Sequence, residues 1–331
     1  MFSSTLVRLR THLAAAALGT AFIASAGSVG FAQQEINIEF SSSAVDANWG
    51  VMIQAMRDSM EEIGKELNAT FTLNVSDAGL NVDKQISDIQ TATVKQPDVL
   101  IIDPVDPAGV LPAAQAAKAA GIKLFTIRTA ASDPAGLYDG AFETNLEPVY
   151  AANLTTWIEG LLAADPALKI KAGILYGAAA QEPQLIRGDV VKTIAAAHPD
   201  QVEVVAEKFA DWSLETAQNA TTDFITAHPD INLIVAANNQ MAMGAANAIA
   251  TAGKTGQVMV ATYDIDRPTV QAIIDGKLTF TTSVEFRSYG RAILLGVAQI
   301  AQGNYPGTLD VKPIWTVTKD NAAEVLPQLA P

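Results

Sequence analysis

The segment Ile231–Gly244, which reads Ile-Asn-Leu-Ile-Val-Ala-Ala-Asn-Asn-Gln-Met-Ala-Met-Gly, decides the fold of this chain. Its apolar, β-branched run at 231–236 is typical of a buried parallel strand. The run ends at a polar turn, and an alanine-rich helix follows from about Met241. Ligands of open α/β sheets bind beyond the carboxyl ends of the strands, so we expect Asn238 to reach a ligand site. An amide both donates and accepts hydrogen bonds without charge, which suits a hydroxyl-rich molecule.

The same alternation of apolar runs and amphipathic helices extends along nearly the whole chain. Runs of strand length lie at 36–40, 71–75, 99–102, 123–127, 172–176, 202–209, 231–236, 258–263, 278–284 and near Trp315. Helical spacing predicts helices after Asn48 and at 82–94, 110–120, 147–162, 181–197, 213–227, 268–274 and 288–301. Strands that alternate with helices form parallel sheets, so we predict an α/β fold with doubly wound parallel sheets. The pattern restarts after a Pro/Gly-bearing segment at 132–136, where we expect the chain to cross between two lobes.

Residues 1–32 have the features of a secretory signal peptide. Two arginines, Arg8 and Arg10, precede an apolar run from Leu13 to about Ala26, and small residues at 30 and 32 predict cleavage after Ala32. The run is short for a membrane-spanning helix, and no cysteine follows it as a lipid attachment site. We therefore expect an exported, periplasmic protein with no stable membrane insertion after cleavage.

Composition argues against several classes of partner and site. The chain of 331 residues has a net charge of −14, which becomes −16 once residues 1–32, with two arginines and no acid, are removed. Such acidity disfavours nucleic acid as a partner. There is no cysteine, and the two histidines beyond residue 32, His198 and His228, each stand in an Ala-His-Pro-Asp helix end. We therefore expect no metal site, no cofactor and no histidine-based catalysis.

Polar and aromatic residues follow most of the predicted strands. Carboxylates, amides and guanidinium groups hydrogen-bond hydroxyl groups, and tryptophan faces pack on the C–H surface of a sugar ring. A lone Asp at a strand end is also a common helix cap, which leaves two interpretations of Asp106. Arg187 alone is equally compatible with a surface ion pair. The candidate residues of this kind are Asp46, Asn48, Trp49, Asp106, Arg128, Arg187, Trp212, Asn238 and Asp264.

Two segments carry a resemblance to a known family. Thr226–Ala245 contains Thr-Ala-His-Pro-Asp and Asn-Asn-Gln-Met-Ala-Met-Gly-Ala, and Val260–Leu278 contains Val-Ala-Thr-Tyr-Asp and Asp-Gly-Lys-Leu. The chain resembles the periplasmic sugar-binding proteins of ABC importers, of the ribose/galactose-binding type, over nearly all of 33–317. A sugar-responsive repressor of the same fold is excluded, because a signal peptide stands where its DNA-binding helices would lie.

The resemblance implies the type I periplasmic binding protein fold, with two lobes joined by a hinge of three crossings. The N-terminal lobe is expected to contain 33–137 and about 285–311. The C-terminal lobe is expected to contain 138–284 and about 312–331. The crossings are expected near 134–140, 284–287 and 309–313.

The resemblance also implies ligand roles for individual residues. Asn238 and Asp264 are similar to the hydroxyl-binding Asn and Asp of the family. The other implied positions are Arg128 and Arg187 as ligand-binding arginines, Trp212 as a stacking aromatic residue, Tyr263 as a further aromatic residue, Asp46, Asn48 and Trp49 in the first loop, and Asp106 near the cleft.

Two departures from the family pattern bear on the ligand. Ile127 stands where the family often has Asp before the arginine that Arg128 matches, and Glu285 is the polar residue nearest to a late Gln that often closes the site. Loss of a carboxylate that clamps two hydroxyl groups argues against ribose. Another pentose, a deoxysugar, a polyol and a furanose-like signal stay open as ligands.

We therefore predict a monomeric periplasmic protein that captures a small neutral sugar or polyol by hinge closure and delivers it to an ABC permease and its ATPase. An alternative is a periplasmic receptor that reports the ligand to a sensor kinase or chemoreceptor, because the same fold and site serve both roles. A sugar-processing enzyme is a third hypothesis, which turnover of a bound sugar by the purified protein would support.

Overall fold

The structure is a computed structural model. It describes residues 33–127, 134–141, 146–179, 181–307, 309, 311 and 313–329. The predicted signal peptide (1–32), Arg128 and part of the first predicted crossing lie outside the described residues. In the part that is described, no helix has the length and apolar character needed to cross a membrane.

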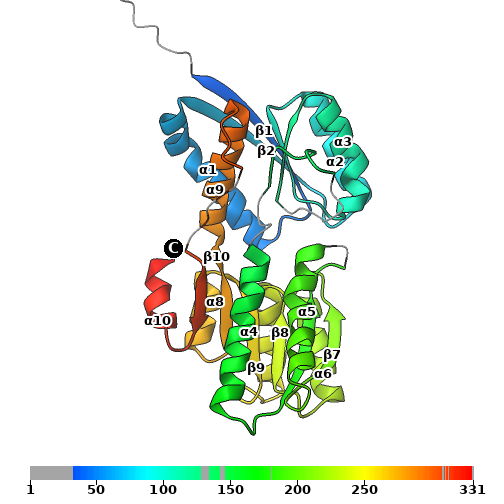
Figure 1. Ribbon diagram of the computed structural model, residues 1–331, viewed down its shortest axis with the longest axis vertical. Coiled ribbons are helices and arrows are strands. Elements are labelled where there is room, and N and C mark those ends of the chain that lie inside the picture. Colours follow the sequence, from blue (N-terminus) through cyan, green and yellow to red (C-terminus); the bar gives the residue numbers. More distant parts are fainter. Residues whose placement is uncertain are drawn as a thin grey trace, which may run out of the picture. The chain divides into compact units, whose positions relative to one another are not determined.

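The first lobe is built on a five-stranded parallel sheet (Figure 1). Its strand order is β2-β1-β3-β4-β5. Helices α2 and α3 cover one side of this sheet, and α1 and α9 pack together on the other. The strands are β1 (Gln34–Ser42), β2 (Ala69–Asp77), β3 (Val99–Ile102), β4 (Lys123–Thr126) and β5 (Gly140–Ala141), and the helices are α1 (Ala47–Leu67), α2 (Val82–Lys95), α3 (Pro107–Ala119) and α9 (Phe286–Gln302).

The second lobe is built on a six-stranded sheet of order β11-β10-β9-β8-β6-β7. All neighbours pair in parallel except β11, which runs antiparallel to β10 at the edge. The strands are β6 (Ile170–Tyr176), β7 (Val202–Phe209), β8 (Leu233–Ala236), β9 (Met259–Ile265), β10 (Phe280–Glu285) and β11 (Trp315–Thr318). The helices are α4 (Leu146–Ala164), α5 (Glu182–Ala197), α6 (Leu214–Ala227), α7 (Asn239–Thr251), α8 (Arg267–Ile274) and α10 (Ala322–Val325), with the 3-10 turn η1 (Leu326–Gln328).

The parallel strands of both sheets follow the same order. In the first lobe the order starts β2-β1-β3, and in the second lobe the equivalent strands are β7-β6-β8. Each sheet therefore has a point where the direction of winding reverses, between β1 and β3 and between β6 and β8. The loops at the carboxyl ends of these strands separate at that point and leave a crevice for a ligand.

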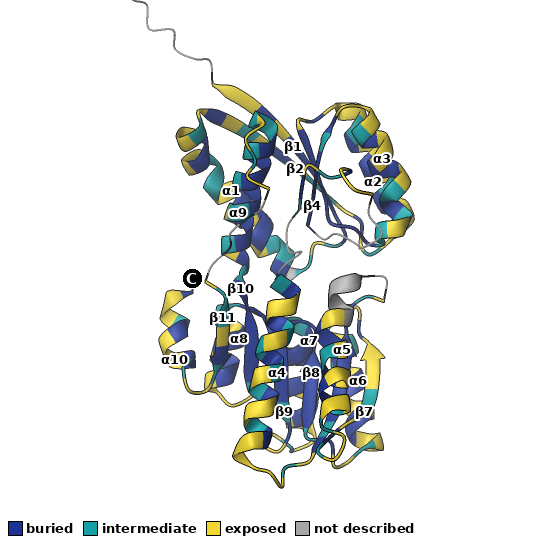
Figure 2. Ribbon diagram, viewed as in Figure 1, coloured by how far each residue is buried: buried dark blue, intermediate teal, exposed yellow. Residues whose placement is uncertain are grey.

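Each face of each sheet has its own apolar core, and Figure 2 shows both sheets as largely buried beneath helices that are exposed on their outer sides. In the first lobe, Ile36, Ile38 and Phe40 of β1 belong to the core under α1 and α9. In the second lobe, Leu233 and Val235 face the α4–α5 side, while Ile234 and Ala236 face the α6–α7 side. Strand β8 is therefore buried on both faces, which explains why its sequence is apolar at every position.

The chain passes between the two sheets three times. These passages lie between β5 and α4, between β10 and α9, and between α9 and β11. The second passage has no loop, because β10 ends at Glu285 and α9 begins at Phe286. The first passage follows β5, so Gly140 and Ala141 belong to the first sheet, whereas the sequence placed residues from 138 onward in the second lobe.

The predicted fold class is confirmed, and most predicted elements lie within a few residues of their expected positions. Strands β3 and β7 have the predicted bounds. Strand β8 begins at Leu233, two residues later than predicted, after a turn in which the Ile231 amide donates to the His228 carbonyl. The short strand β5 and the antiparallel direction of β11 were not predicted, since neither has a hydrophobic pattern of its own.

Gly244, the last residue of the segment that opened the sequence, allows α7 to pack closely on α6. A Cβ atom at this position would lie 2.1 Å from the carbonyl oxygen of Leu214 and 3.0 Å from the amide nitrogen of Gln218, both backbone atoms of α6. Backbone atoms inside a packed helix pair have little freedom to retreat. Gly160 in α4 is a matched contrast, since a Cβ there would meet no atom within 4 Å.

We predict that Gly244→Ala lowers the free energy of unfolding by about 2 kcal/mol or more, because the added methyl group forces α6 and α7 apart. Gly160→Ala is the control and should raise it by roughly 0.5–1 kcal/mol, since alanine restricts the unfolded chain and favours the helix. Urea denaturation followed by circular dichroism measures both. Equal stability of the Gly244→Ala variant and the native protein would contradict the close approach of the two helices.

Candidate functional site

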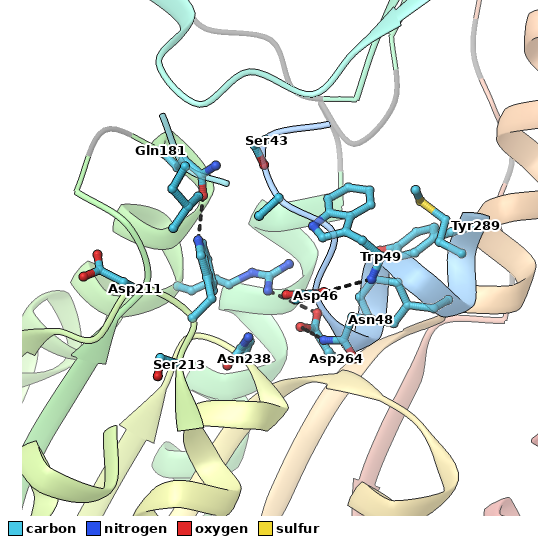
Figure 3. Close-up of a pocket in the computed structure, with 16 residues that line it drawn as sticks. Ser43, Asp46, Asn48, Trp49, Gln181, Asp211, Ser213, Asn238, Asp264 and Tyr289 are labelled. Carbon is cyan, nitrogen blue, oxygen red and sulfur yellow. Dashed lines mark hydrogen bonds and ion pairs between the residues drawn. The ribbon is translucent and has the colours of Figure 1, made fainter. Parts of the chain in front are cut away.

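A cavity of about 250 Å³ lies where the carboxyl ends of strands from both sheets meet (Figure 3). Loops after β1 and β2 contribute from the first lobe, together with the first turns of α1 and α9. The loops after β6, β7 and β8, the end of β9 and helix α5 contribute from the second lobe. The lining residues are Ser43, Ala44, Asp46, Asn48, Trp49, Met52, Leu80, Gln181, Arg187, Asp211, Trp212, Ser213, Asn238, Asp264, Phe286 and Tyr289.

The polar turn after β8 gives its two asparagines different tasks. Asn238 is the N-cap of α7, and its Oδ1 accepts a hydrogen bond of 2.8 Å from the Met241 amide. Asn238 also lines the cavity, and this cap uses the oxygen of its amide group. The Asn239 side chain instead donates to Asp266 and Thr269 inside the lobe, each at 3.1 Å. Asn239 is therefore a structural residue, as expected for the start of the helix.

Asn48 connects the two lobes across the cavity. It lies in the first turn of α1, and its Nδ2 donates to Asn239 Oδ1 at 2.8 Å and to Asp264 Oδ2 at 3.4 Å. A second contact between the lobes joins the hydroxyl groups of Tyr150 in α4 and Tyr289 in α9, 2.6 Å apart. These bonds between distant segments hold the two lobes against each other around the cavity.

Arg187 is the centre of a buried ion cluster. Its Nε donates to both carboxylate oxygens of Glu147, at 2.9 and 3.2 Å, and its Nη2 donates to Glu147 Oε1 at 2.7 Å. Its Nη1 donates to the Ala237 carbonyl at 2.9 Å and to Asp264 Oδ1 at 3.2 Å. The forked contact with Glu147 matches the planar geometry of a guanidinium group. Arg187 is therefore a buried partner of two carboxylates and not a surface ion-pair residue.

Asp264 lies at the end of β9 with an unusual backbone and a shifted pKa. Its φ of 69° is in the left-handed region, which non-glycine residues seldom adopt. Burial raises the pKa of its carboxyl group to about 6; Glu147 and Asp46 also raise this pKa, and Arg187 opposes the rise. The carboxyl group of Asp264 therefore loses its proton at a higher pH than an exposed aspartate does.

Left-handed backbone conformations cluster at the cavity. Among the described residues, six non-glycine residues have positive φ values, and two of them, Asn68 and Gln96, are helix C-caps. The other four line the cavity: Leu80, Asp211, Trp212 and Asp264. Such conformations cost free energy and persist where the surrounding structure holds them, most often at functional sites.

Trp212 is fixed at the cavity wall by two contacts. Its Nε1 donates a hydrogen bond of 2.6 Å to Gln181 Oε1. Its ring lies against the backbone of Gly177, where a Cβ atom would be only 2.2 Å from the indole. Trp49 lies on the first-lobe side (Figure 3), and its ring forms a T-shaped contact with that of Phe40. The two indoles give the cavity apolar surfaces beside its hydrogen-bonding groups, an arrangement suited to a sugar or polyol.

Comparison with known proteins gives the family. The sequence model of the periplasmic binding protein domain matches residues 39–304. The chain belongs to the periplasmic binding protein family. The ribose import binding protein RbsB of Escherichia coli is 30% identical over 233 residues, which cover 69% of this chain and 73% of RbsB. The xylitol-binding protein of Mycolicibacterium smegmatis is 27% identical over 308 residues, covering 90% and 85% of the two chains.

A solved structure agrees with this assignment. An ABC transporter solute binding protein from Mycobacterium smegmatis with bound glycerol is 26% identical, has a TM-score of 0.78, and aligns over 88% of this chain and 97% of its own. These relatives and this fold are those of substrate-binding proteins, not of enzymes.

In this periplasmic binding protein, the cavity collects most of the residues selected from the sequence. They are Asp46, Asn48, Trp49, Arg187, Trp212, Asn238 and Asp264. Their ligand contacts stay a prediction, but their convergence follows from the strand order of the two sheets. Arg128 lies outside the described residues.

Three further selected residues are not brought to the cavity. Asp106 caps α3, where its Oδ1 accepts a hydrogen bond of 3.0 Å from the Ala108 amide. Tyr263 is fully buried beneath Arg187, and its hydroxyl donates to the Arg187 carbonyl at 2.9 Å. Glu285 is the residue before α9 and is absent from the lining. Tyr263 precedes Asp264 on β9, so the two side chains point to opposite faces of the sheet. Asp106 precedes α3, and its side chain caps that helix.

Sequence reasoning missed several lining residues and one buried partner. Gln181 and Ser43 follow β6 and β1, so the rule that ligands lie beyond strand ends would have found them. Met52, Phe286 and Tyr289 are apolar or aromatic residues of helix starts and have no distinguishing pattern. Glu147, at the start of α4, had no signal at all, because its partner Arg187 is 40 residues away in the chain.

The described residues contain no group of three or more His, Cys, Asp or Glu side chains placed to hold a metal ion. The cavity chemistry consists of carboxylates, amides, hydroxyls, one guanidinium group and aromatic rings among its described lining residues. Groups of these kinds are able to hydrogen-bond a polar organic molecule.

The raised pKa of Asp264 predicts a specific dependence of stability on pH. A carboxyl group whose pKa is higher in the folded protein than its model value of 3.8 binds its proton more tightly when folded. Its stabilising contribution is therefore complete below pH 3.8 and is lost as the pH rises through about 6.

We predict that ligand-free native protein gains about 1 kcal/mol of unfolding free energy relative to Asp264→Asn when the pH is lowered from 7 to 5. Asparagine keeps the shape of the side chain and does not titrate, so the difference between the two proteins isolates this group from other titrating residues. Urea denaturation at both pH values measures it. A difference that is constant with pH, or that moves the other way, would contradict the raised pKa.

Proposed function

We propose that this chain is a periplasmic solute-binding protein that captures a small sugar or polyol by closure of its two lobes and delivers it to an ABC importer. The observation that carries the proposal is the cavity itself. It lies at the carboxyl ends of strands from both sheets and is lined by Asn238, Asp264 and two tryptophans. A ligand there contacts both lobes at once, so its binding favours the closed arrangement.

The relatives support the ligand class. Two of them are named for the binding of ribose and xylitol, and the solved relative holds glycerol. All three molecules are small and carry several hydroxyl groups on a short carbon skeleton. The cavity of about 250 Å³ is slightly smaller than the range of roughly 300–1,000 Å³ for ligand pockets, which fits one molecule of this size.

The contacts between the lobes support the closure mechanism. Asn48 in the first lobe bonds Asn239 and approaches Asp264 in the second, directly beside the cavity. A ligand that bonds the Asp264 carboxylate and the Asn238 amide adds further bridges to the same face. Ligand binding and lobe closure then stabilise each other. A bound ligand adds contacts between the closed lobes, and closure brings together the residues that contact the ligand.

Export belongs to the same proposal. Residues 1–32 would direct the chain to the periplasm and be removed after Ala32. Mass spectrometry of the protein purified from the periplasm identifies its first residue, for which we expect Gln33. A periplasmic location is required for a protein that delivers its ligand to the outer face of a permease.

We predict that a thermal-shift screen of pentoses, hexoses, deoxysugars, polyols and their amino derivatives identifies at least one stabilising ligand. A ligand at 100 times its dissociation constant should stabilise the protein by roughly 2.7 kcal/mol. Amino acids serve as the contrasting class. Stabilisation by amino acids alone would contradict the proposed ligand class.

We further predict that Asn238→Ala weakens binding of the identified ligand at least about 10-fold, through loss of its amide donor in a buried site. The same substitution removes a helix cap and should lower the unfolding free energy by about 1 kcal/mol. Asp106→Ala is the matched control, because it removes the cap of α3 outside the cavity. It should show a similar loss of stability with unchanged affinity in isothermal titration calorimetry. Unchanged affinity in both variants would remove Asn238 from the site.

Transport and signalling roles require a different test, because both use the same binding step. We expect the ligand-bound protein to stimulate ATP hydrolysis by the cognate permease and ATPase reconstituted in liposomes. A protein that instead changes only the activity of a sensor kinase would be a periplasmic receptor, the alternative role for the same fold.

A further inference from the structure

Two neighbouring loops of the first lobe, one after β1 and one after β2, contribute to the cavity wall. The residues that they contribute are Ser43, Ala44, Asp46 and Leu80. The Leu80 amide donates to the Ser43 carbonyl at 2.8 Å, and a second backbone bond of 3.0 Å runs from the Ala78 amide to the Ser42 carbonyl. The two loops are therefore joined through their backbones. We refer to residues 42–46 and 77–81 together as the paired loops.

The backbone of the loop after β2 is strained. Gly79 and Leu80 have φ values of 59° and 60°, and for leucine this left-handed conformation is costly. Asp77 holds the same turn, because its Oδ1 accepts hydrogen bonds from the Gly79 amide at 2.9 Å and from the Val45 amide at 3.2 Å. A strained conformation persists where the surrounding contacts hold it. The position of Leu80 at the cavity wall therefore depends on the loop to which it is bonded.

Asp103 fixes the loop after β1 from behind the cavity wall. It directly follows β3, is fully buried, and is not among the described lining residues. Its Oδ2 accepts a hydrogen bond of 2.5 Å from the Ser43 hydroxyl and one of 3.2 Å from the Ser43 amide. One carboxyl group thus holds both the side chain and the main chain of Ser43. These bonds join the ends of β1 and β3, the two strands between which the winding of this sheet reverses.

Gln85 in turn holds the backbone of Asp103. It lies on α2 and is fully buried. Its Nε2 donates to the Asp103 carbonyl at 2.7 Å and to the Ser41 carbonyl at 3.4 Å, and its Oε1 accepts from the Val105 amide at 2.7 Å. A buried amide group costs free energy unless its polar atoms are bonded. The bonds of Gln85 meet this requirement and secure the backbone at the ends of β1 and β3 together.

We propose that Asp103 and Gln85 are positioning residues for ligand binding. They hold the paired loops in one conformation before the ligand enters, and they act through Ser43 and Leu80, which line the cavity. Ordering a loop on binding costs affinity, and a loop that is already ordered avoids this cost. The inference rests on the proposed function and identifies residues of the first lobe on which the affinity depends without contact with the ligand.

Asp98 is a matched control at the other end of the same strand. It directly precedes β3, as Asp103 directly follows it. Its Oδ2 accepts a hydrogen bond of 2.8 Å from the Asn37 amide of β1. Both aspartates therefore connect the ends of β3 to the chain of β1. Asp98, however, is exposed and lies at the amino end of β3, whereas the cavity lies at the carboxyl ends of the strands.

The first readout needs no ligand. Amide hydrogen exchange of the full protein, followed by mass spectrometry, measures protection of the paired loops. Their hydrogen-bonded amides include those of Ser43, Val45, Ala78 and Leu80. We expect exchange there to become about 10-fold faster or more in Asp103→Ala and in Gln85→Leu, because each substitution removes bonds that hold the loops. Asp98→Ala should leave exchange in the paired loops unchanged.

The second readout is affinity, measured by isothermal titration calorimetry. The probe is xylitol or, where xylitol does not bind, the sugar or polyol that gives the largest shift in the thermal screen. We expect Asp103→Ala and Gln85→Leu each to weaken binding by about 5-fold or more. Asp98→Ala should bind the probe as the native protein does. If Asp103→Ala does not fold, Gln85→Leu supplies both readouts, since leucine is close to glutamine in size and makes none of its hydrogen bonds.

Exchange in the presence of the probe separates positioning from a general loss of stability. In the native protein the paired loops are already ordered, so the bound probe adds little protection there. In Asp103→Ala and Gln85→Leu the loops become ordered on binding, so the gain in protection should be larger. A role confined to overall stability predicts the same gain in the variants as in the native protein, and that result would overturn the inference.

A double-substitution cycle tests whether Asp103 acts through Ser43. Ser43→Ala removes the hydroxyl group that Asp103 holds. If the two residues act as one unit, the protein with both Ser43→Ala and Asp103→Ala binds the probe only slightly more weakly than Asp103→Ala alone. Fold-losses of affinity that multiply would overturn the route through Ser43.

The outcomes distinguish this inference from the proposed function. If the probe binds and both variants keep the native affinity, or the native exchange in the paired loops, the positioning role is overturned and the proposed function stands. An equal loss of affinity in Asp98→Ala would also overturn it, because the effect would not be specific to the cavity end of β3. If no sugar or polyol binds the native protein, the proposed function is overturned, and the role in binding that rests on it is overturned too.

Discussion

The buried contact between Arg187 and Glu147 is the interaction on which the ligand surface of the second lobe depends. It joins α5 to α4, and through Nη1 it also reaches the end of β8 at Ala237 and the end of β9 at Asp264. Burying these charges is costly unless every partner is present. The cluster therefore fixes the relative positions of four elements that are distant in sequence, and the cavity wall that carries Asn238 and Asp264 takes its shape from them.

The strand order of the two sheets determines where a ligand crevice can form. Because both sheets reverse their winding at equivalent strands, β1/β3 and β6/β8, each has its crevice at the same place. The residues that complete the site also carry its backbone strain, since Asp211, Trp212 and Asp264 have left-handed conformations. Packing against Gly177 and the hydrogen bond to Gln181 hold Trp212 in place. The two sheets thus support a cavity wall whose backbone is locally strained.

The sequence predicted the strands and helices well because apolar periodicity is a local property, and β3 and β7 have the predicted bounds. It identified Asn238 and Asp264 for a physical reason, since polar residues at the ends of buried strands must meet at one sheet edge. It left two interpretations where a local pattern has two meanings: Asp106 follows a strand, as a ligand-binding residue would, and it also precedes a helix, which it caps in the structure. It could not identify Glu147, because a pairing across 40 residues leaves no trace in composition or spacing.

The direct junction of β10 and α9 has a mechanical consequence. With Glu285 ending the strand and Phe286 starting the helix, this passage has no slack chain in which a displacement between the lobes could be absorbed. At this passage, a change in the relative orientation of the two sheets would require rotation about the backbone torsions of the residues that join the strand to the helix.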